Sequence, residues 1–176
     1  VNAFSLSSLT LVNCNTDNLV SVIPGKTWTF NAIPSANGEV KIDLTAGKVF
    51  DLAGNGNLAA TQLSINYSNE RPSVILTTTA ADPTNLTPLP VRIEFSKTIS
   101  GFTLSDIVVV NGVAGNLVIQ TADRIWDFEV TPDADGEVKI NLAENSVSDS
   151  AGNGNTAAAE LVRVFDKTDP AVAFST

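Results

Sequence analysis

The sequence predicts an all-β protein built from tandem antiparallel Greek-key β-sandwiches. Three observations lead to this prediction. A segment of nearly one hundred residues is repeated along the chain. Each copy consists of short runs rich in β-branched and aromatic residues, and these runs are separated by clusters of Gly, Asn, Asp and Pro. No stretch of ten or more residues has a helical period, so strands joined by turns are expected throughout.

The repeat is found by shifting the chain by 98 residues. Residues 1–78 then align with residues 99–176 without a gap, and about 31 of the 78 pairs are identical. The matched pairs include Trp28 with Trp126 and Phe30 with Phe128. Self-similarity at a fixed period is typical of modular arrays, so the chain is expected to be part of a tandem array.

The repeat divides the chain unevenly. Residues 73–169 form one complete unit, and residues 170–176 form the start of a third. Residues 1–72 form a partial unit that lacks the counterparts of its first two strands. An exposed sheet edge and an open core are expected there. The missing strands would come either from preceding chain or from another molecule, and segment 171–176 could supply only one of them.

Seven β-rich runs follow one another in the complete unit. They span residues 73–79, 89–95, 106–110, 116–120, 124–130, 136–142 and 160–166. Seven short strands in about 98 residues predict a sandwich of immunoglobulin type, with about seven strands in each complete unit.

The run around Trp126 predicts the centre of the core. Apolar Trp126, Phe128 and Val130 alternate with acidic Asp127 and Glu129, as expected for a strand with one buried face. The Trp–x–Phe strand of each copy is therefore expected to fill its core. It takes the place of a disulfide, because the chain has a single cysteine.

Charge and composition exclude several classes of function. The net charge is −9, and the ten Lys and Arg residues form no cluster, so nucleic acid and anionic membranes are poor partners. No apolar run approaches the ~20 residues that span a bilayer. The chain has no His, and its acidic pairs are not repeated between the copies, so no enzymatic activity is expected.

Four segments in order, "PVRIEFSKTISGFTLSDIVVVNG", "TPDADGEVKINL", "DSAGNGNTA" and "DKTDP", carry a family resemblance. They resemble the bacterial immunoglobulin-like (Big-type) tandem repeats of large secreted and cell-surface adhesins, with a D-x-AGN-x-N element. The resemblance covers essentially the whole chain. It implies an extracellular or cell-surface location, and it implies adhesins and stalks as the kind of protein to which the chain belongs.

Acidic turns and the inter-unit junction are the candidate metal sites. "DLAGNGN" and "DSAGNGN" are best interpreted as tight turns, because Asp, Asn and Gly suit turn geometry and no calcium-loop spacing accompanies them. Calcium stiffens such junctions in similar adhesins, and Asp166 and Asp169 lie at the junction that follows the complete unit. Asp149, Asp166 and Asp169 are therefore the candidate calcium ligands, and no other cofactor is required.

The expected function is structural. The chain is predicted to be a non-catalytic spacer in a bacterial adhesin, extending a binding tip from the cell. Its partners would be neighbouring Ig-like repeats of the same long chain, with a host, surface or glycan ligand bound through other domains. Two alternatives remain: a module that binds a glycan or protein directly, and an accessory region of a secreted multidomain enzyme.

Overall fold

A computed structural model describes residues 4–175 of the chain. The chain folds into two compact units, unit 1 (Val1–Glu70) and unit 2 (Arg71–Thr176). Strands dominate both units, and the only helical elements among the described residues are two short 3-10 turns, η1 (Leu6–Ser8) and η2 (Leu104–Asp106). No helix in this part of the chain is long and apolar enough to cross a membrane.

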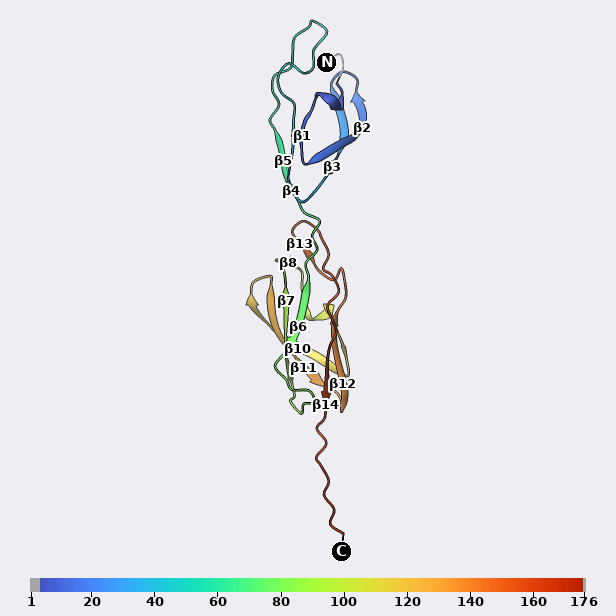
Figure 1. The fold of residues 1–176 in the computed structure, drawn as a ribbon, viewed down its shortest axis with the longest axis vertical. Coiled ribbons are helices and arrows are strands. Elements are labelled where there is room, and N and C mark those ends of the chain that lie inside the picture. The colour runs from blue at the N-terminus through green and yellow to red at the C-terminus, as the bar shows by residue number, and fades with distance from the viewer. Residues whose placement is uncertain (1–3, 176) are drawn as a thin grey trace. The chain divides into compact units, whose positions relative to one another are not determined.

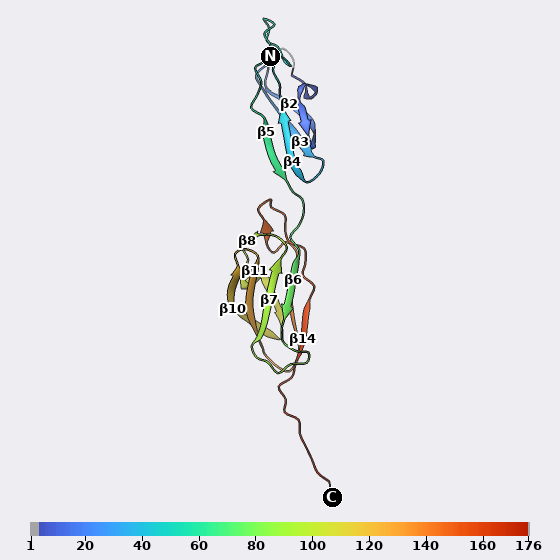
Figure 2. The ribbon, with the colours of Figure 1, turned by 60° about the vertical axis from the view of Figure 1, so that its left-hand side comes forward.

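Unit 2 contains two main antiparallel sheets. One has the strand order β10-β11-β7-β6, which can be followed in Figure 2, and the other has the order β14-β12-β9. A third, two-stranded sheet pairs β13 with β8. The strands are β6 (Val74–Thr78), β7 (Leu89–Phe95), β8 (Ile99–Ser100), β9 (Ile107–Val110), β10 (Gly112–Thr121), β11 (Ile125–Pro132), β12 (Gly136–Leu142), β13 (Ser148–Asp149) and β14 (Leu161–Phe165).

Each of the seven predicted runs overlaps one strand, whereas β8 and β13 were not predicted. These two strands have two residues each, which is too short for an alternating pattern to be seen in sequence. They are held by pairing with each other. The all-β prediction is therefore confirmed for this unit.

One hydrophobic core lies between the two main sheets of unit 2. It draws buried side chains from β6, β7, β9, β11, β12 and β14. Trp126 and Phe128, predicted to fill this core, are only 5% and 2% exposed. The Trp126 ring packs edge-on against Phe95, with ring centroids 5.7 Å apart, and lies 5.0 Å from Phe102. This aromatic cluster lies in the core of unit 2.

Unit 1 contains the sheets β1-β4-β5 and β2-β3 (Figure 1). Its strands are β1 (Thr10–Val12), β2 (Cys14–Ile23), β3 (Thr27–Pro34), β4 (Gly38–Asp43) and β5 (Leu63–Tyr67). Their registers match those of unit 2 after the shift of 98 residues. Cys14 pairs with Pro34 as Gly112 pairs with Pro132, and the ladder shifts at the same two places.

The core of unit 1 is smaller than expected. Trp28 and Phe30 are only half-buried, so the prediction that they fill a core as Trp126 and Phe128 do is wrong in degree. The reason is that unit 1 has no strands on the far side of β3 among its described residues. Phe4 partly covers Trp28, at a centroid distance of 5.4 Å, and the buried free thiol of Cys14 packs as a small apolar group.

Candidate functional site

The repeated "DSAGNGN" loop of unit 2 is organised around Asp149. One carboxylate oxygen, Oδ1, accepts the backbone N–H groups of Ala151 at 3.0 Å and Asn153 at 2.9 Å. The Asn153 amide also donates to both carboxylate oxygens, and Lys97 Nζ lies 3.7 Å from Oδ2. These donors, above all the Asn153 N–H, lower the pKa of Asp149. The carboxylate therefore acts as an acceptor for its own turn.

Asn155, at the end of the same loop, is completely buried. Its Oδ1 accepts the backbone N–H of Val147 at 3.0 Å. Its Nδ2 donates to the carbonyl oxygens of Ala143 and Thr156, both at 2.8 Å. The side chain thus hydrogen-bonds to three backbone groups that have no partner in a strand ladder. Buried backbone polar groups need such partners.

Unit 1 repeats the hydrogen bonds of the Asp and Asn side chains at the equivalent positions and, among the described residues, does so without the lysine contact. The Asp51 carboxylate accepts the backbone N–H groups of Ala53 and Asn55. The side-chain amide of Asn55 also donates to this carboxylate and is the main cause of the lowered pKa of Asp51. Asn57 accepts from Lys48 and Val49 and donates to Thr45 O and Leu58 O. Because both copies use these side chains on their own backbone, the shared residues of the motif are accounted for by loop architecture.

A second repeated contact fixes the segment that leaves each unit. In unit 2, Asp135 Oδ1 accepts the backbone N–H of Lys167 at 2.8 Å, and Oδ2 accepts the Thr168 hydroxyl. The Thr168 hydroxyl, followed by the Lys167 N–H, lowers the pKa of Asp135. In unit 1, Asn37 stands at the equivalent position and accepts the N–H of Asn69 at 2.8 Å. The hairpin turn after β3 or β11 therefore holds the exit segment in both units.

Asn13 and Asn111 form another matched pair that sequence reasoning missed. Each has a positive φ, 56° and 60°, at the corner between two strands. Each side chain donates to a hairpin carbonyl at 2.8 Å, Ala36 O or Ala134 O, and accepts the N–H of the same residue at 3.1 Å. Identity of the two Asn residues across the repeat was the signal available in the sequence.

Arg71 contacts the same end of unit 2 as Asn155. Its guanidinium donates to Gly154 O at 2.8 Å, Asn155 O at 2.6 Å and Asn145 Oδ1 at 2.9 Å. It also forms an ion pair with Glu144 at 3.2 Å. Sequence reasoning gave Arg71 no role, because its counterpart in the repeat is Asp169 and the contact is therefore not repeated in sequence.

The structure does not bring the three candidate calcium ligands together. Asp166 follows β14, where its N–H donates to Thr84 O at 2.9 Å, and Asp169 is exposed beyond it. Asp149 lies near the opposite end of β12. A strand of seven residues is roughly 20 Å long, so a distance of this order separates Asp149 from Asp166. Among the residues that the structure describes, no three acidic or Cys side chains are grouped to hold a metal. A calcium role for Asp149, Asp166 and Asp169 stays a prediction.

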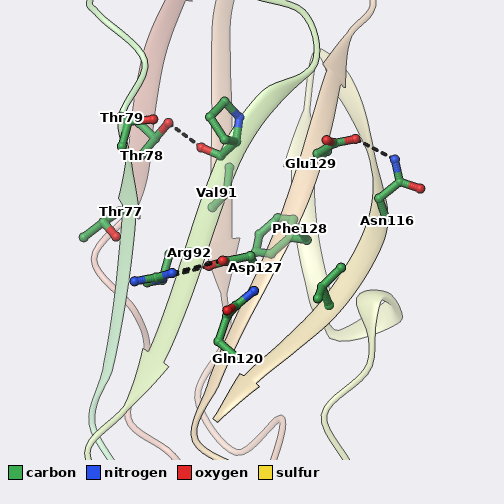
Figure 3. A pocket seen from close by; sticks show the side chains of 12 residues that line it. Thr77, Thr78, Thr79, Val91, Arg92, Asn116, Gln120, Asp127, Phe128 and Glu129 are labelled. Carbon is green, nitrogen blue, oxygen red and sulfur yellow. Dashed lines mark hydrogen bonds and ion pairs between the residues drawn. The ribbon is translucent and has the colours of Figure 1, made fainter.

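A shallow groove of about 490 Å³ lies on the outer face of the four-stranded sheet of unit 2 (Figure 3). Arg92 and Asp127 cross it as a bidentate ion pair at 2.7 and 3.0 Å, and Asn116 donates to Glu129. Arg92 lowers the pKa of Asp127, and Asp127 raises the pKa of Arg92. The polar groups of the groove are thus largely paired with one another.

The groove gives little support to direct ligand binding by an aromatic platform. Its one aromatic lining residue, Phe128, is buried in the core, as is Trp126. In unit 1, Thr29 and Asn31 stand where unit 2 has Asp127 and Glu129, so the arrangement of charges is not repeated. The repeated loop side chains hydrogen-bond to their own backbone, whereas the unrepeated Asp127 and Glu129 pair with Arg92 and Asn116 at the surface.

Comparison with known proteins places the molecule in a family. Residues 68–164, more than half of the chain, match the model of the bacterial Ig-like domain. The chain belongs to this family. A comparison with curated proteins returns no match. Bacterial Ig-like domains are generally found in extracellular and surface proteins, where they act as structural modules.

Proposed function

We propose that the chain is a non-catalytic structural module of a bacterial cell-surface or secreted adhesin. In this proposal, tandem Ig-like Greek-key units set the distance between the cell and a binding domain located elsewhere in the same long protein. The units are the partial repeat 1–72, the complete repeat 73–169 and the start of a third at 170–176. Their immediate partners are the neighbouring repeats.

One observation carries the proposal. The residues shared by the two copies, including Asp51 with Asp149 and Asn57 with Asn155, hydrogen-bond to their own loops. A repeated reaction or a repeated ligand would instead require shared polar groups directed outward, into a cavity. A structural module that is repeated along a chain requires the same internal contacts in every copy, and these residues provide them.

The exit contacts support a role in spacing. Asp135 and Asn37 hold the chain just beyond the last strand of their units, and prolines follow at positions 72 and 170. Proline fixes φ and favours extended geometry in the preceding residue. No Gly/Ser-rich segment separates the repeats, so the linkers are expected to be short and modestly flexible.

The proposal is tested in the parent protein by deleting residues 73–169 and, separately, by replacing them with an unrelated Ig-like domain. We expect the deletion to reduce attachment of cells while soluble ligand binding is retained, and the replacement to restore attachment. Failure of the replacement, together with loss of soluble ligand binding, would show that residues 73–169 recognise the ligand directly.

A further inference from the structure

The loop between β12 and β14 of unit 2 surrounds the guanidinium of Arg71 with four acceptors. Arg71 Nε donates to Gly154 O at 2.8 Å, and Nη2 donates to Asn155 O at 2.6 Å. Nη2 also donates to Asn145 Oδ1 at 2.9 Å, and both Nη atoms lie 3.2 Å from Glu144 Oε2. A planar fork with five N–H donors matches such a set of acceptors, and arginine is the side chain that has this fork.

Two replacements in a repeated loop create this site. The equivalents of Glu144 and Asn145 in unit 1 are Ala46 and Gly47, neither of which has a side-chain acceptor. The two side chains that distinguish the loops here are thus the two that contact Arg71. The site is therefore a property of unit 2 and not of the repeated loop in general.

Asn145 keeps a backbone conformation that suits glycine better. Its φ is 59°, in the left-handed region, and the φ of Gly47 is 74°. Because this region is easiest for glycine, the asparagine is best explained by the acceptor that its side chain supplies. A Cβ at Gly154 would overlap Asn145 Oδ1, so the glycine leaves the space that this oxygen occupies beside Arg71.

The residues that follow Arg71 are also bound to unit 2. Pro72 is fully buried, and its carbonyl oxygen accepts the N–H of Thr156 at 2.9 Å. Ser73 N–H donates to Ser96 Oγ at 2.9 Å, and Ser73 O accepts the N–H of Ser96 at 3.0 Å. Arg71 is the first of three successive bound residues, so it sets the point at which the entry segment becomes fixed.

We propose that this site recognises an arginine in the entry segment and thereby selects which linker can precede unit 2. The junction that follows unit 2 carries Asp169 at the position of Arg71. A carboxylate has no donor for the carbonyl oxygens of the site and repels Glu144, so the site rejects an entry segment of that kind. The two junctions are then chemically distinct, and repeats cannot be exchanged without their entry segments. This consequence for the order of repeats rests on the proposed function, whereas the site itself does not.

A double-mutant cycle on the full chain tests the site. Trp28→Phe makes Trp126 the only tryptophan, so that its emission reports unfolding of unit 2. We expect Arg71→Ala to lower the melting temperature of unit 2 by roughly 5 °C or more, because it leaves acceptors unpaired. Glu144→Ala with Asn145→Gly gives the loop its unit 1 form, and in that chain Arg71→Ala should lower the temperature by about half as much or less. Equal losses in the two loops would overturn the proposal.

Selection is tested by two further replacements of the same residue. Arg71→Lys keeps the charge without the fork and should lose most of the stability that Arg71→Ala loses. Arg71→Asp gives unit 2 the entry residue of the following junction. It should melt below Arg71→Ala in the native loop, because the new carboxylate faces Glu144, and level with it in the unit 1 form of the loop. An Arg71→Asp chain that melts level with or above Arg71→Ala in the native loop would show that the site does not select.

Amide hydrogen exchange separates loss of this anchor from general destabilisation. The Thr156 N–H is bonded to Pro72 O in the entry segment, whereas the Ala158 N–H is bonded to Leu142 O within the unit. Arg71→Ala should speed exchange of the Thr156 amide roughly tenfold and change that of Ala158 less. Equal changes at the two amides would overturn the anchoring role of Arg71. All these readouts are made on the chain alone, so they can succeed or fail independently of the adhesin role.

Discussion

The side chain of Asn155 bonds to three backbone groups at the irregular end of unit 2. The loop between β12 and β14 has little ladder pairing of its own, yet part of its backbone is buried. The Asn155 side chain supplies one acceptor and two donors to backbone groups of this loop. Its counterpart Asn57 makes the same contacts and is only partly buried, so the same chemistry should contribute less there.

Asn155→Ala should lower the unfolding free energy of unit 2 by about 2–3 kcal/mol, because it leaves buried backbone groups unpaired. Asn57→Ala should cost unit 1 less, since water can replace the lost partners. Urea denaturation followed by Trp126 emission, in a Trp28→Phe background, measures the first effect. Glu160→Ala, on the exposed surface nearby, is the control and should be neutral.

The Asp149 carboxylate makes the stability of unit 2 depend on pH. Its pKa is lowered in the folded state by the N–H groups that it accepts. A group whose pKa is lower in the folded state than in the unfolded state stabilises the fold at pH values above its unfolded pKa, which is near 3.9 for Asp. This stabilisation is lost as the pH falls through the folded pKa. Wild-type protein should therefore melt higher than Asp149→Asn at pH 7.

The difference in melting temperature between wild type and Asp149→Asn should shrink as the pH falls below about 4, when the wild-type carboxylate is also neutral. Thermal scans from pH 7 to pH 3 check this expectation. Asp135 has a lowered pKa for a similar reason, so Asp135→Asn should behave in the same direction. A difference that stays constant across this range would show that the charge of Asp149 has no part in holding the turn.

At the scale of elements, β3 and β11 are the same strand in two environments. Both carry the Trp–x–Phe pattern, and both pair with a long bulged neighbour, β2 or β10. Only β11 is also covered by β7. The free energy gained from the same side chains should therefore differ between the units, since apolar stabilisation scales with the area removed from water.

Phe128→Ala should destabilise unit 2 by about 3–5 kcal/mol, the usual cost of removing a fully buried Phe. Phe30→Ala should cost unit 1 only about 1–2 kcal/mol, because half-burial leaves less area to lose. Single-tryptophan backgrounds allow each unit to be followed separately in urea. Equal losses in both units would contradict the open core of unit 1.

The sequence pattern was sufficient for the long strands and insufficient for contacts that have no periodicity. Alternation around Trp126 predicted which face of β11 is buried, because a strand with one face in a core must alternate. The two-residue strands β8 and β13 carry no such signal. The role of Arg71 was also not predictable, since it depends on carbonyl groups more than seventy residues away in the chain. Of the candidate metal ligands, sequence proximity placed Asp166 with Asp169, whereas the fold separates both from Asp149.

At the scale of the whole molecule, the acidic composition does not by itself create a metal site. The Asp149 carboxylate is occupied by donors from its own loop, and Asp166 lies at the other end of β12. The calcium role of Asp149, Asp166 and Asp169 stays a prediction, and the melting temperature of unit 2 in millimolar calcium, compared with that in EDTA, tests it. A ligand that binds only the folded state raises this temperature, so a calcium-dependent rise would support the prediction and an unchanged temperature would contradict it.

The two units should also differ in stability as wholes. Unit 2 encloses an extensive core between two sheets, whereas unit 1 buries few apolar side chains. Because domain stability depends on apolar area buried, Trp28 should report unfolding at lower urea concentration than Trp126. Coincident transitions in the two single-tryptophan variants would show that the units do not differ in this way.

Amide hydrogen exchange of the native chain, resolved by residue, tests the central claim most directly. The claim is that both units are copies of one Ig-like building block and that, among the described residues, β3 is paired along one edge only, with β2. We expect the amides of β11 to be protected on both of its edges. In β3, alternate amides facing β2 should be protected, while those on the opposite edge should exchange as fast as loop amides. Uniform protection along the whole of β3 would contradict the claim.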